Sequence, residues 1–540
     1  MFSTLEHPLL GHVKGLKAKT PGVVQYLGIP YATLAHRFAA PELKSDHGGT
    51  IDATKRGCPS FFRPSVIRPP VACDIEFGLI QKALDNRQDL PISDLDGLNL
   101  DIVVPEAAVK EHQASLPVLV WIHGGGYIIG DTGLPHCDLG PIVAYSQSIG
   151  KPIIGVAINY RLGVPGFLDS DELRATGAPA NRGLLDQKVA LQWLRQNISG
   201  FSGDLNRITA IGQSAGASAV MHLLDSESPE DRLFYRAICL GGNNLAVPSL
   251  PRHVAQDTYK AILQCLGIDS NLSGEDQVAA LTSVPPEELL SKVPMSIPLL
   301  PVVEMDKLAS FQAVERQKSS SQHRIPLMIG SADFDGVIFG VLGLFTGRDE
   351  GSIGQEFVDY FMRTVPAAHH DKVKSLLSQY GISTGSEAND QVRTGILEFG
   401  TDLKYFASSK HYASFWPAES WLYYFNESNP WDGPHKGRSC HCLDIAYLFL
   451  NYSNVMNQDQ KETGKRFANE VIEFTNGEAP WAEFKSSGKI RVYGSHLESK
   501  VAEITAKELK EGPSLEVQAL WEDIGLDNLG RAWDAYAARL

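Results

Sequence analysis

The sequence predicts an α/β protein with a mostly parallel central sheet, helices on both faces and helical lid insertions. Three observations lead to this fold class. Short, nearly continuous apolar runs are bounded by turn residues, as in strands that are covered on both faces. Segments with helical periodicity lie between these runs. A Gly-x-Ser-x-Gly turn centred on Ser214 joins one of the runs to a helical segment.

The predicted elements follow one another along most of the chain. Five apolar runs are predicted as strands, at residues 118–122, 153–158, 208–211, 325–329 and 421–425. Four segments are predicted as helices, at residues 182–198, 357–378, 391–408 and 461–475. Since strands and helices alternate, we expect the strands to lie mostly parallel in one sheet.

The spacing of the strands predicts the domain organisation. About 110 residues separate the third predicted strand from the fourth, and about 90 separate the fourth from the fifth. These intervals are predicted to be helical, and no Pro/Ser-rich linker or internal repeat divides the chain. We therefore expect a single domain over residues 1–540, with lid or insert segments at about 240–322 and 337–415.

Composition argues against several classes of function. The apolar content of 43% and the charged content of 21% are those of a globular protein. The net charge of −15, from 63 acidic and 48 basic residues, argues against a surface for nucleic acid or anionic membrane. No apolar run approaches the ~20 residues of a membrane-spanning helix. We expect a small-molecule partner, no nucleic acid and no membrane span, while the oligomeric state stays open.

The two ends of the chain and its cysteines predict a location inside the cell. The N-terminal segment has no continuous apolar core and therefore no secretory signal. The seven cysteines are an odd number spread over a large chain, which fits reduced thiols. The C-terminal Ala538-Arg539-Leu540 is like a peroxisomal address, although such an ending also arises by chance. We expect a cytoplasmic protein that is not secreted, with the peroxisome as the alternative.

Ser214 lies in a motif that is typical of a nucleophilic serine. Gly212-Gln213-Ser214-Ala215-Gly216 connects a predicted buried strand to a predicted helix, which is the nucleophile elbow of the α/β-hydrolases. The turn holds the serine in a strained backbone conformation and requires small residues on either side. With 49 glycines in the chain, an ordinary glycine-rich turn remains an equal alternative for this motif alone.

A second glycine-rich loop follows the strand at residues 118–122. It reads His123-Gly124-Gly125-Gly126. Backbone N–H groups of such a loop can stabilise the negative oxygen that forms when an ester is attacked. The alternatives are a flexible turn or a phosphate cradle, but no Gly-Lys-Ser/Thr and no GxGxxG supports phosphate binding. The two glycine motifs together predict acyl-transfer chemistry.

Further blocks occur in a characteristic order along the chain. They read Gly28-Ile29-Pro30-Tyr31-Ala32, Asn159-Tyr160-Arg161-Leu162-Gly163 and Gly183-Leu184-Leu185-Asp186-Gln187. With these blocks the sequence resembles the type-B carboxylesterase/lipase family (cholinesterase-like) of the α/β-hydrolase fold over nearly its whole length. The resemblance implies Gly125, Gly126 and Ala215 as the donors of an oxyanion hole, and it implies no cofactor.

The resemblance also implies an acid and a base. Asp335, directly before Gly336, matches the family's acid, with Asp333 as the competing residue. His441 stands in a block that is similar to the family's histidine block, with His435 as the runner-up. Cys440-His441-Cys442 could suggest a metal, but no second ligand pair supports a zinc site. We expect the triad Ser214, Asp335 and His441, and no metal.

The sequence departs from the family pattern at several positions. Gln213 stands where many members have Glu, and no tryptophan occurs before residue 121. Both differences argue against choline esters as substrates. Gly97 replaces the cysteine that normally pairs with Cys58, so Cys58 is expected to be free. Gly241 replaces a serine that usually supports the acid, which weakens the expected surroundings of Asp335.

These features predict a serine carboxylesterase that hydrolyses esters of small hydrophobic molecules through an acyl-enzyme. One alternative is an acyltransferase or a lactone-forming or lactone-opening enzyme of secondary metabolism, which uses the same triad. A more remote alternative is a non-catalytic adhesion or scaffold homologue. The intact pair of Ser214 and His441 argues against the last.

Overall fold

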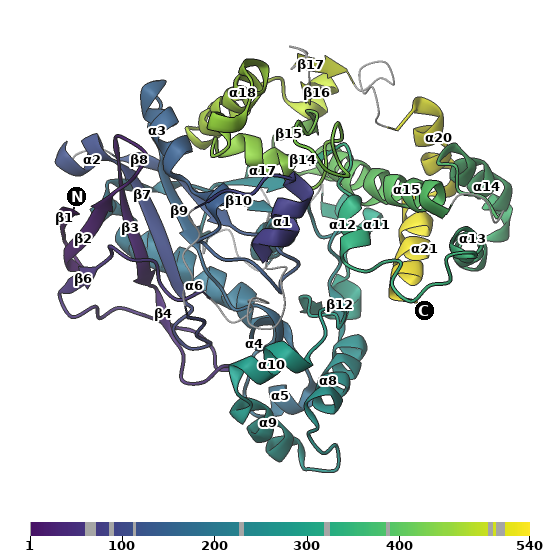
Figure 1. The fold of residues 1–540 in the computed structure, drawn as a ribbon, viewed down its shortest axis with the longest axis horizontal. Helices are drawn as coiled ribbons and strands as arrows, with labels where there is room; N and C mark the ends of the chain where they lie inside the picture. Colours follow the sequence, from purple (N-terminus) through teal and green to yellow (C-terminus); the bar gives the residue numbers. More distant parts are fainter. Residues whose placement is uncertain are drawn as a thin grey trace.

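A computed structural model describes residues 2–59, 72–85, 91–111, 115–225, 232–317, 325–384, 389–494, 500–503 and 513–539. Its centre is a 13-stranded sheet of order β1-β2-β3-β7-β9-β8-β10-β11-β14-β15-β16-β17, with β6 paired to β2 (Figure 1). The strands are β1 Phe2–His7, β2 Gly11–Lys17, β3 Val23–Pro30, β6 Thr50–Asp52, β7 Asn99–Pro105, β8 Leu116–Ile122, β9 Ile154–Ile158, β10 Gly203–Gln213, β11 Arg236–Leu240, β14 Leu327–Ala332, β15 Ser420–Asn426, β16 Lys489–Gly494 and β17 Lys500–Glu503.

The middle of the sheet is parallel, as the sequence predicts. All neighbours from β9 through β16 pair in parallel, and the five predicted strands correspond to β8, β9, β10, β14 and β15. The strands β1, β2, β3 and β7 pair antiparallel at one edge, and β17 does so at the other. The five predicted strands did not include β11 and β16 of the parallel part, or β3 and β7, which are largely buried. The strands β1 and β2 were also missed, because they expose part of their residues and contain charged side chains.

Helices cover both faces of the parallel strands. Along β8, Val118 and Val120 face one hydrophobic core, while Leu119 and Trp121 face another. The first core includes α6 Arg182–Asn197 and α7 Ala215–Asp225, and the second includes α3 Gly140–Ser148 and α18 Gln458–Thr475. This alternation is the period of two that a strand buried on both faces requires.

Two long helical insertions interrupt the sheet. The insertion between β11 and β14 contains β12 Leu250–Pro251, α8 Arg252–Leu266, α9 Gly274–Ser283, α10 Pro286–Lys292, β13 Val302–Val303 and α11 Phe311–Gln317. The insertion between β14 and β15 contains α12 Val337–Val341, α13 Ile353–Thr364, α14 His370–Gln379, α15 Asn389–Gly400, the π-helix η7 Thr401–Ala407 and α16 Ser408–Phe415. In Figure 1, α8, α9 and α10 of the first insertion lie below the sheet, whereas α11 lies beside α12 of the second insertion. The helices α13, α14 and α15 of the second insertion lie beside α20 Leu515–Ile524 and α21 Leu526–Ala538.

Two of the predicted helices differ from the structure. The segment 357–378 is divided into α13 and α14, because Pro366 disfavours helical geometry at the residue before it. The segment 391–408 changes from an α-helix to a π-helix after Gly400. Apolar periodicity predicts that a segment is helical, but it does not distinguish an α-helix from a π-helix.

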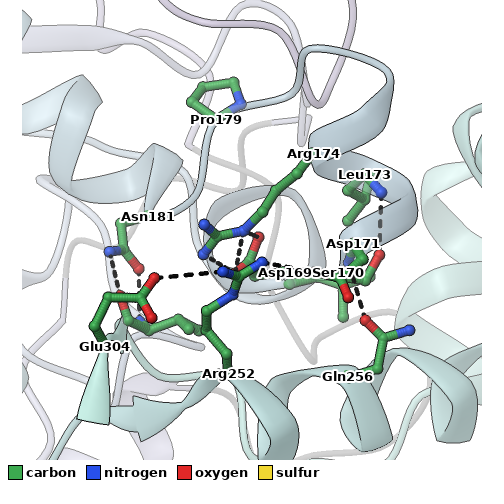
Figure 2. A network of polar contacts seen from close by, with 12 residues as sticks. Asp169, Ser170, Asp171, Leu173, Arg174, Pro179, Asn181, Arg252, Gln256 and Glu304 are labelled. Atoms are coloured by element: carbon green, nitrogen blue, oxygen red, sulfur yellow. Dashed lines mark hydrogen bonds and ion pairs between the residues drawn. The ribbon is translucent and has the colours of Figure 1, made fainter.

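A polar network joins the first insertion to the sheet-bearing part of the chain (Figure 2). Arg252, at the start of α8, forms ion pairs with Asp171 at 2.7 Å and with Glu304 at 3.5 Å. The side chain of Asn181 donates to the carbonyl of Val302 and accepts from its N–H, at 2.8 and 2.7 Å. Exposed ion pairs contribute little to stability. The two hydrogen bonds between the side-chain amide of Asn181 and the backbone of Val302 therefore fix the position of β13 more strongly.

Within the described residues, no helix is both long and apolar enough to cross a membrane.

Candidate active site

Ser214 lies between the end of β10 and the start of α7, in a strained conformation. Its φ is +55°, in the left-handed region that non-glycine residues rarely adopt. A Cβ atom added to Gly212 would lie 2.2 Å from the carbonyl oxygen of Gly216, and one added to Gly216 would lie 2.1 Å from that of Ile122. The close approach of backbone to backbone therefore explains both glycines of the motif.

The glycine loop after β8 lies directly beside Ser214. A Cβ on Gly124 would be 3.2 Å from the Cβ of Ser214. Gly125 and Gly126 have φ values of +99° and +61°, and the carbonyl of Gly125 accepts bonds from the two N–H groups that close this loop. Among the described residues, the N–H groups of Gly125, Gly126 and Ala215 have no hydrogen-bond partner. Unpaired donors beside a serine can bind an oxyanion.

The surroundings of this serine are buried, but the serine itself is reachable. Gly124 and Gln213 are buried, whereas Ser214, Gly125 and Gly126 are partly exposed. A small molecule can therefore reach the serine and the loop donors together.

The structure brings His441 and Asp335 together in the interior. His441 Nδ1 donates to Asp335 Oδ1 at 2.6 Å, and the two side chains are 2% and 1% exposed. The other oxygen of Asp335 accepts from the N–H of Ala332 at 2.6 Å. The proton on Nδ1 leaves Nε2 with a lone pair, which is the tautomer that a general base requires.

Asp333, the competing acid, lies in other surroundings. Its Oδ1 accepts from the hydroxyl of Tyr424 at 2.8 Å, and its Oδ2 lies 3.5 Å from Arg438 Nε. The two aspartates are separated by one residue, yet only Asp335 contacts the imidazole of His441.

Gln213 provides a contact that sequence reasoning missed. Its side-chain Nε2 donates to His441 Nε2 at 3.0 Å, and the residue is 1% exposed. The lone pair that would accept the proton of Ser214 is thus bound by the neighbouring amide. The position was visible in the sequence as a missing carboxylate, but the sequence contains no signal for this contact.

Asp444 is a second buried carboxyl group close to the pair. Burial, and then the charge of Asp335, raise its pKa to about 6. Its carboxyl group accepts from the hydroxyl of Tyr423 at 3.1 Å and from the N–H of Ile445 at 2.9 Å. In the sequence it is the acidic residue three positions after His441.

Gly241 lies against the acid without contributing a hydrogen bond from a side chain. A Cβ at this position would be 3.1 Å from Asp335 Oδ1, and the φ of Gly241 is +48°. The N–H of Ala332 and His441 therefore hold Asp335 where a serine hydroxyl is absent.

The other candidate histidines lie in different surroundings. The ring of His123 stacks on Tyr160 at 4.5 Å, its Nδ1 bonds to the carbonyl of Gly124, and burial lowers its pKa. The backbone N–H of His435 donates to Gln81. Both arrangements are structural, whereas His441 bonds to a carboxylate.

No metal site is visible in the part of the chain that the structure describes, where no three metal-ligating side chains gather. Burial raises the pKa of Cys440 to about 12 and that of Cys442 well above its usual range. Burial therefore disfavours the thiolate form of both groups.

The sequence also predicts lid segments near 60–90, 285–310 and 336–362, with Phe339, Leu342 and Phe345 lining an apolar pocket. Phe339 packs on Tyr405 and Trp533, with ring centroids 5.6 and 4.9 Å apart. Leu342 is 53% exposed and faces solvent. Within the expected lid segment at 60–90, residues 60–71 and 86–90 lie outside the described residues.

Comparisons with known proteins show the family to which the chain belongs. The model of the "Carboxylesterase family" matches residues 3–517. A para-nitrobenzyl esterase of Bacillus subtilis is 28% identical over 88% of both chains. The pyrethroid hydrolase Ces2a of Mus musculus is 27% identical over 88% of this chain and 81% of the relative. Secreted lipase 5 of Gibberella zeae is 33% identical over 50% of both chains.

A solved structure supports the fold. A PNB esterase superposes with a TM-score of 0.70 at 24% identity, covering 95% of this chain and 100% of that chain. This likeness shows the α/β-hydrolase fold that the sequence motifs predict.

Proposed function

Because the chain belongs to the carboxylesterase family, we propose that Ser214, His441 and Asp335 are the catalytic triad of this carboxylic-ester hydrolase. The observation that carries the proposal is the buried 2.6 Å bond from His441 to Asp335, at a site where Ser214 faces unpaired N–H donors. In this proposal Gly125, Gly126 and Ala215 form the oxyanion hole.

The chemistry follows from these roles. When an ester binds, the Ser214 hydroxyl replaces the Gln213 amide at His441 Nε2 and transfers its proton there. The serine oxygen attacks the ester carbonyl, and the three N–H groups bind the oxyanion that forms. The alcohol leaves with the proton from Nε2, and water then releases the acid from the acyl-enzyme by the same two proton transfers. Asp335 keeps the imidazole in the required tautomer and stabilises the imidazolium.

The proposed substrates are esters of small hydrophobic molecules. Gln213 brings no negative charge to the site, and no tryptophan precedes residue 121, so a cationic alcohol finds little to bind it. The relatives include a para-nitrobenzyl esterase, a pyrethroid hydrolase and lipases, but also an acetylcholinesterase of Bungarus fasciatus that is 27% identical over 95% of this chain, so the preference rests on the residues of the site. A panel of p-nitrophenyl esters of increasing acyl length, beside choline esters and lactones, tests this preference.

Two variants and one probe test the triad. Ser214→Ala is expected to abolish labelling by a fluorophosphonate and nearly all turnover. Asp335→Asn is expected to lower kcat by about 10⁴-fold, because the imidazole then has the wrong tautomer. Asp333→Asn is the matched control and should retain most of the activity. Wild-type-like turnover of Ser214→Ala or Asp335→Asn would disprove the assignment.

The cellular location and the domain organisation also stay proposals. We propose one domain over residues 1–540, in which the insertions at about 240–322 and 337–415 act as lids. We also propose a cytoplasmic protein, with the C-terminal tripeptide as a peroxisomal alternative; Leu540 lies outside the described residues. Two of the relatives are named secreted lipases. Imaging of an N-terminally tagged chain distinguishes diffuse, punctate and secreted material, and secretion would contradict the proposal.

A further inference from the structure

A continuous helical segment lies behind the proposed triad and changes its geometry there. The α-helix α15 runs into the π-helix η7 at Thr401, and α16 follows from Ser408. No proline occurs between residues 389 and 415, so proline does not cause the change. π-Helical segments are rare and are frequently found at functional sites. Three residues of this segment contact, in turn, the loop of the acid, the ring of the base and the loop behind the nucleophile.

The first contact is with the loop of the acid. The N–H of Gly336, the residue after Asp335, donates to Thr401 Oγ1 at 2.8 Å. The Thr401 hydroxyl itself donates to the carbonyl of Leu397 at 2.9 Å. A Cβ on Gly336 would lie 2.1 Å from that same carbonyl oxygen. The acid loop therefore rests directly on the backbone of the helical segment.

The second contact is with the base. The ring of Tyr405 lies 5.6 Å from the ring of His441, at an interplanar angle of 58°, and Tyr405 is 2% exposed. Burial, and then the charge of Asp335, raise the pKa of Tyr405 well above its usual range, so the phenol stays neutral. In the resting arrangement Asp335 and Gln213 hold both nitrogens of the imidazole. When the Ser214 hydroxyl replaces the Gln213 amide at His441 Nε2, the ring of Tyr405 still packs against the imidazole and limits its movement.

The third contact is with the loop behind the nucleophile. Asn243 Nδ2 donates to Ser408 Oγ at 2.9 Å, while its Oδ1 accepts from the N–H groups of Leu245 and Ala246. The preceding Gly242 lies against the serine, since a Cβ there would be 2.3 Å from the carbonyl oxygen of Ser214. A hydrogen bond to Ser408 thus determines the position of the loop on which the nucleophile rests.

We propose that Thr401, Tyr405 and Ser408 of this segment position the triad, and that Tyr405 holds the imidazole of His441 in line for proton transfer. This inference rests on the proposed function. Tyr405 is a positioning residue, because it contacts the base and not the reacting atoms of the substrate. Displacement of a catalytic group by about 1 Å can lower the rate by about 100-fold, which sets the scale of the expected effect.

Three variants test the role of Tyr405. Tyr405→Phe keeps the ring and should retain kcat within about 2-fold. Tyr405→Leu removes the ring and should lower kcat by roughly 10- to 100-fold, with KM within about 3-fold of wild type. Phe406→Leu is the matched control: Phe406 is equally buried on the same π-helix, but its ring contacts Tyr424 at 5.6 Å. It should lower the melting temperature without lowering kcat.

A second readout does not depend on turnover. The proton that His441 Nδ1 shares with Asp335 is expected as a low-field resonance in proton NMR spectra of the full chain. It should persist in Tyr405→Phe and Phe406→Leu and broaden or disappear in folded Tyr405→Leu. Unchanged kcat and resonance in Tyr405→Leu, or equal losses in Phe406→Leu, would overturn the proposal. A wild-type chain without esterase activity would refute the proposed function, while the resonance would still report on Tyr405.

Discussion

His441 bonds at both ring nitrogens before any substrate is present. Asp335 accepts at Nδ1, and the amide of Gln213 donates at Nε2. The first bond favours the catalytic tautomer, whereas the second competes with Ser214 for the lone pair. A neutral donor at this position therefore has two effects: it keeps the ring in place, and it adds no charge that would favour the imidazolium.

The charge of residue 213 predicts the pH dependence of activity. In Gln213→Glu a carboxylate would lie about 3 Å from Nε2 and favour the protonated imidazole, which cannot act as a base. We expect the acidic limb of the kcat/KM profile to move to higher pH by about one unit. Gln213→Met is similar in shape and uncharged, so its profile should not move. Equal shifts in both variants would show that charge is not the cause.

At the scale of elements, the strand-turn-helix unit from β10 to α7 depends on backbone contacts that exclude side chains. Gly216 is the tightest example, because its missing Cβ would lie 2.1 Å from the carbonyl oxygen of Ile122 at the end of β8. The turn at Ser214 and the strand β8, which precedes the glycine loop, therefore pack together through backbone atoms alone. A displacement of one necessarily moves the other.

A methyl group at Gly216 tests this coupling. We expect Gly216→Ala to destabilise the protein by about 1–3 kcal/mol through overpacking and to lower kcat, because Ser214 moves relative to the loop donors. Thermal unfolding and steady-state kinetics measure the two effects. Gly78→Ala, in α1 Ala72–Ile80, is the control, since nothing lies within 4 Å of the added Cβ. The coupling would be refuted by a Gly216→Ala protein with wild-type stability and turnover.

The helical insertions show the limit of periodicity at this scale. Sequence reasoning predicted helices at 357–378 and 391–408; in the structure the first is interrupted at residues 365 and 366, and the second is helical throughout. The division at Pro366 was readable from the chain, because proline restricts the residue before it. The π-helix was not, because its turns depend on contacts with Gly336, His441 and Asn243 from other parts of the sequence.

At the scale of the whole molecule, the sheet separates two cores, and the proposed triad lies at the ends of its parallel strands. Ser214 follows β10, and Asp335 follows β14. In open parallel sheets the carboxyl ends of the strands form the usual binding edge. Burying several ionisable groups at this edge lowers the free energy of unfolding of the whole domain.

Asp444 predicts how that stability depends on pH. Its pKa is about 6 in the folded chain, above the 3.8 of a free aspartate, so the folded state binds more protons between these values. Stability due to this group is thus greatest at low pH and is lost as the pH rises through about 6. At pH 7.5 the cost is about 3 kcal/mol. Asp444→Asn should remove this loss.

Chemical denaturation at pH 4 and pH 7.5 measures the effect. The free energy of unfolding of Asp444→Asn, relative to wild type, is expected to be more favourable at pH 7.5 than at pH 4. Any constant loss of hydrogen bonding cancels in this comparison. Asp432→Asn is the control, because it removes an exposed carboxylate whose pKa is lowered by Lys436. Its free energy of unfolding, relative to wild type, should not be more favourable at pH 7.5 than at pH 4. Parallel curves for wild type and Asp444→Asn would contradict the prediction.

The chain by itself determined most of the parallel middle of the sheet, without β11 and β16, and also the two glycine motifs and the family. These features are encoded within a few consecutive residues, since apolar runs, turns and missing side chains constrain the backbone locally. The edge strands β1 and β2 were not determined in this way, because their exposed residues obscure the apolar pattern.

Only the tertiary structure decided which groups meet around Ser214. Asp335 and His441 are 106 residues apart, and Asp333 is separated from Asp335 by a single residue yet faces Tyr424 and Arg438. The contact of Gln213 with His441 spans 228 residues, and Tyr405 reaches the base from an inserted helix. Such contacts depend on how distant loops close over the sheet, and no local pattern of residues specifies that closure.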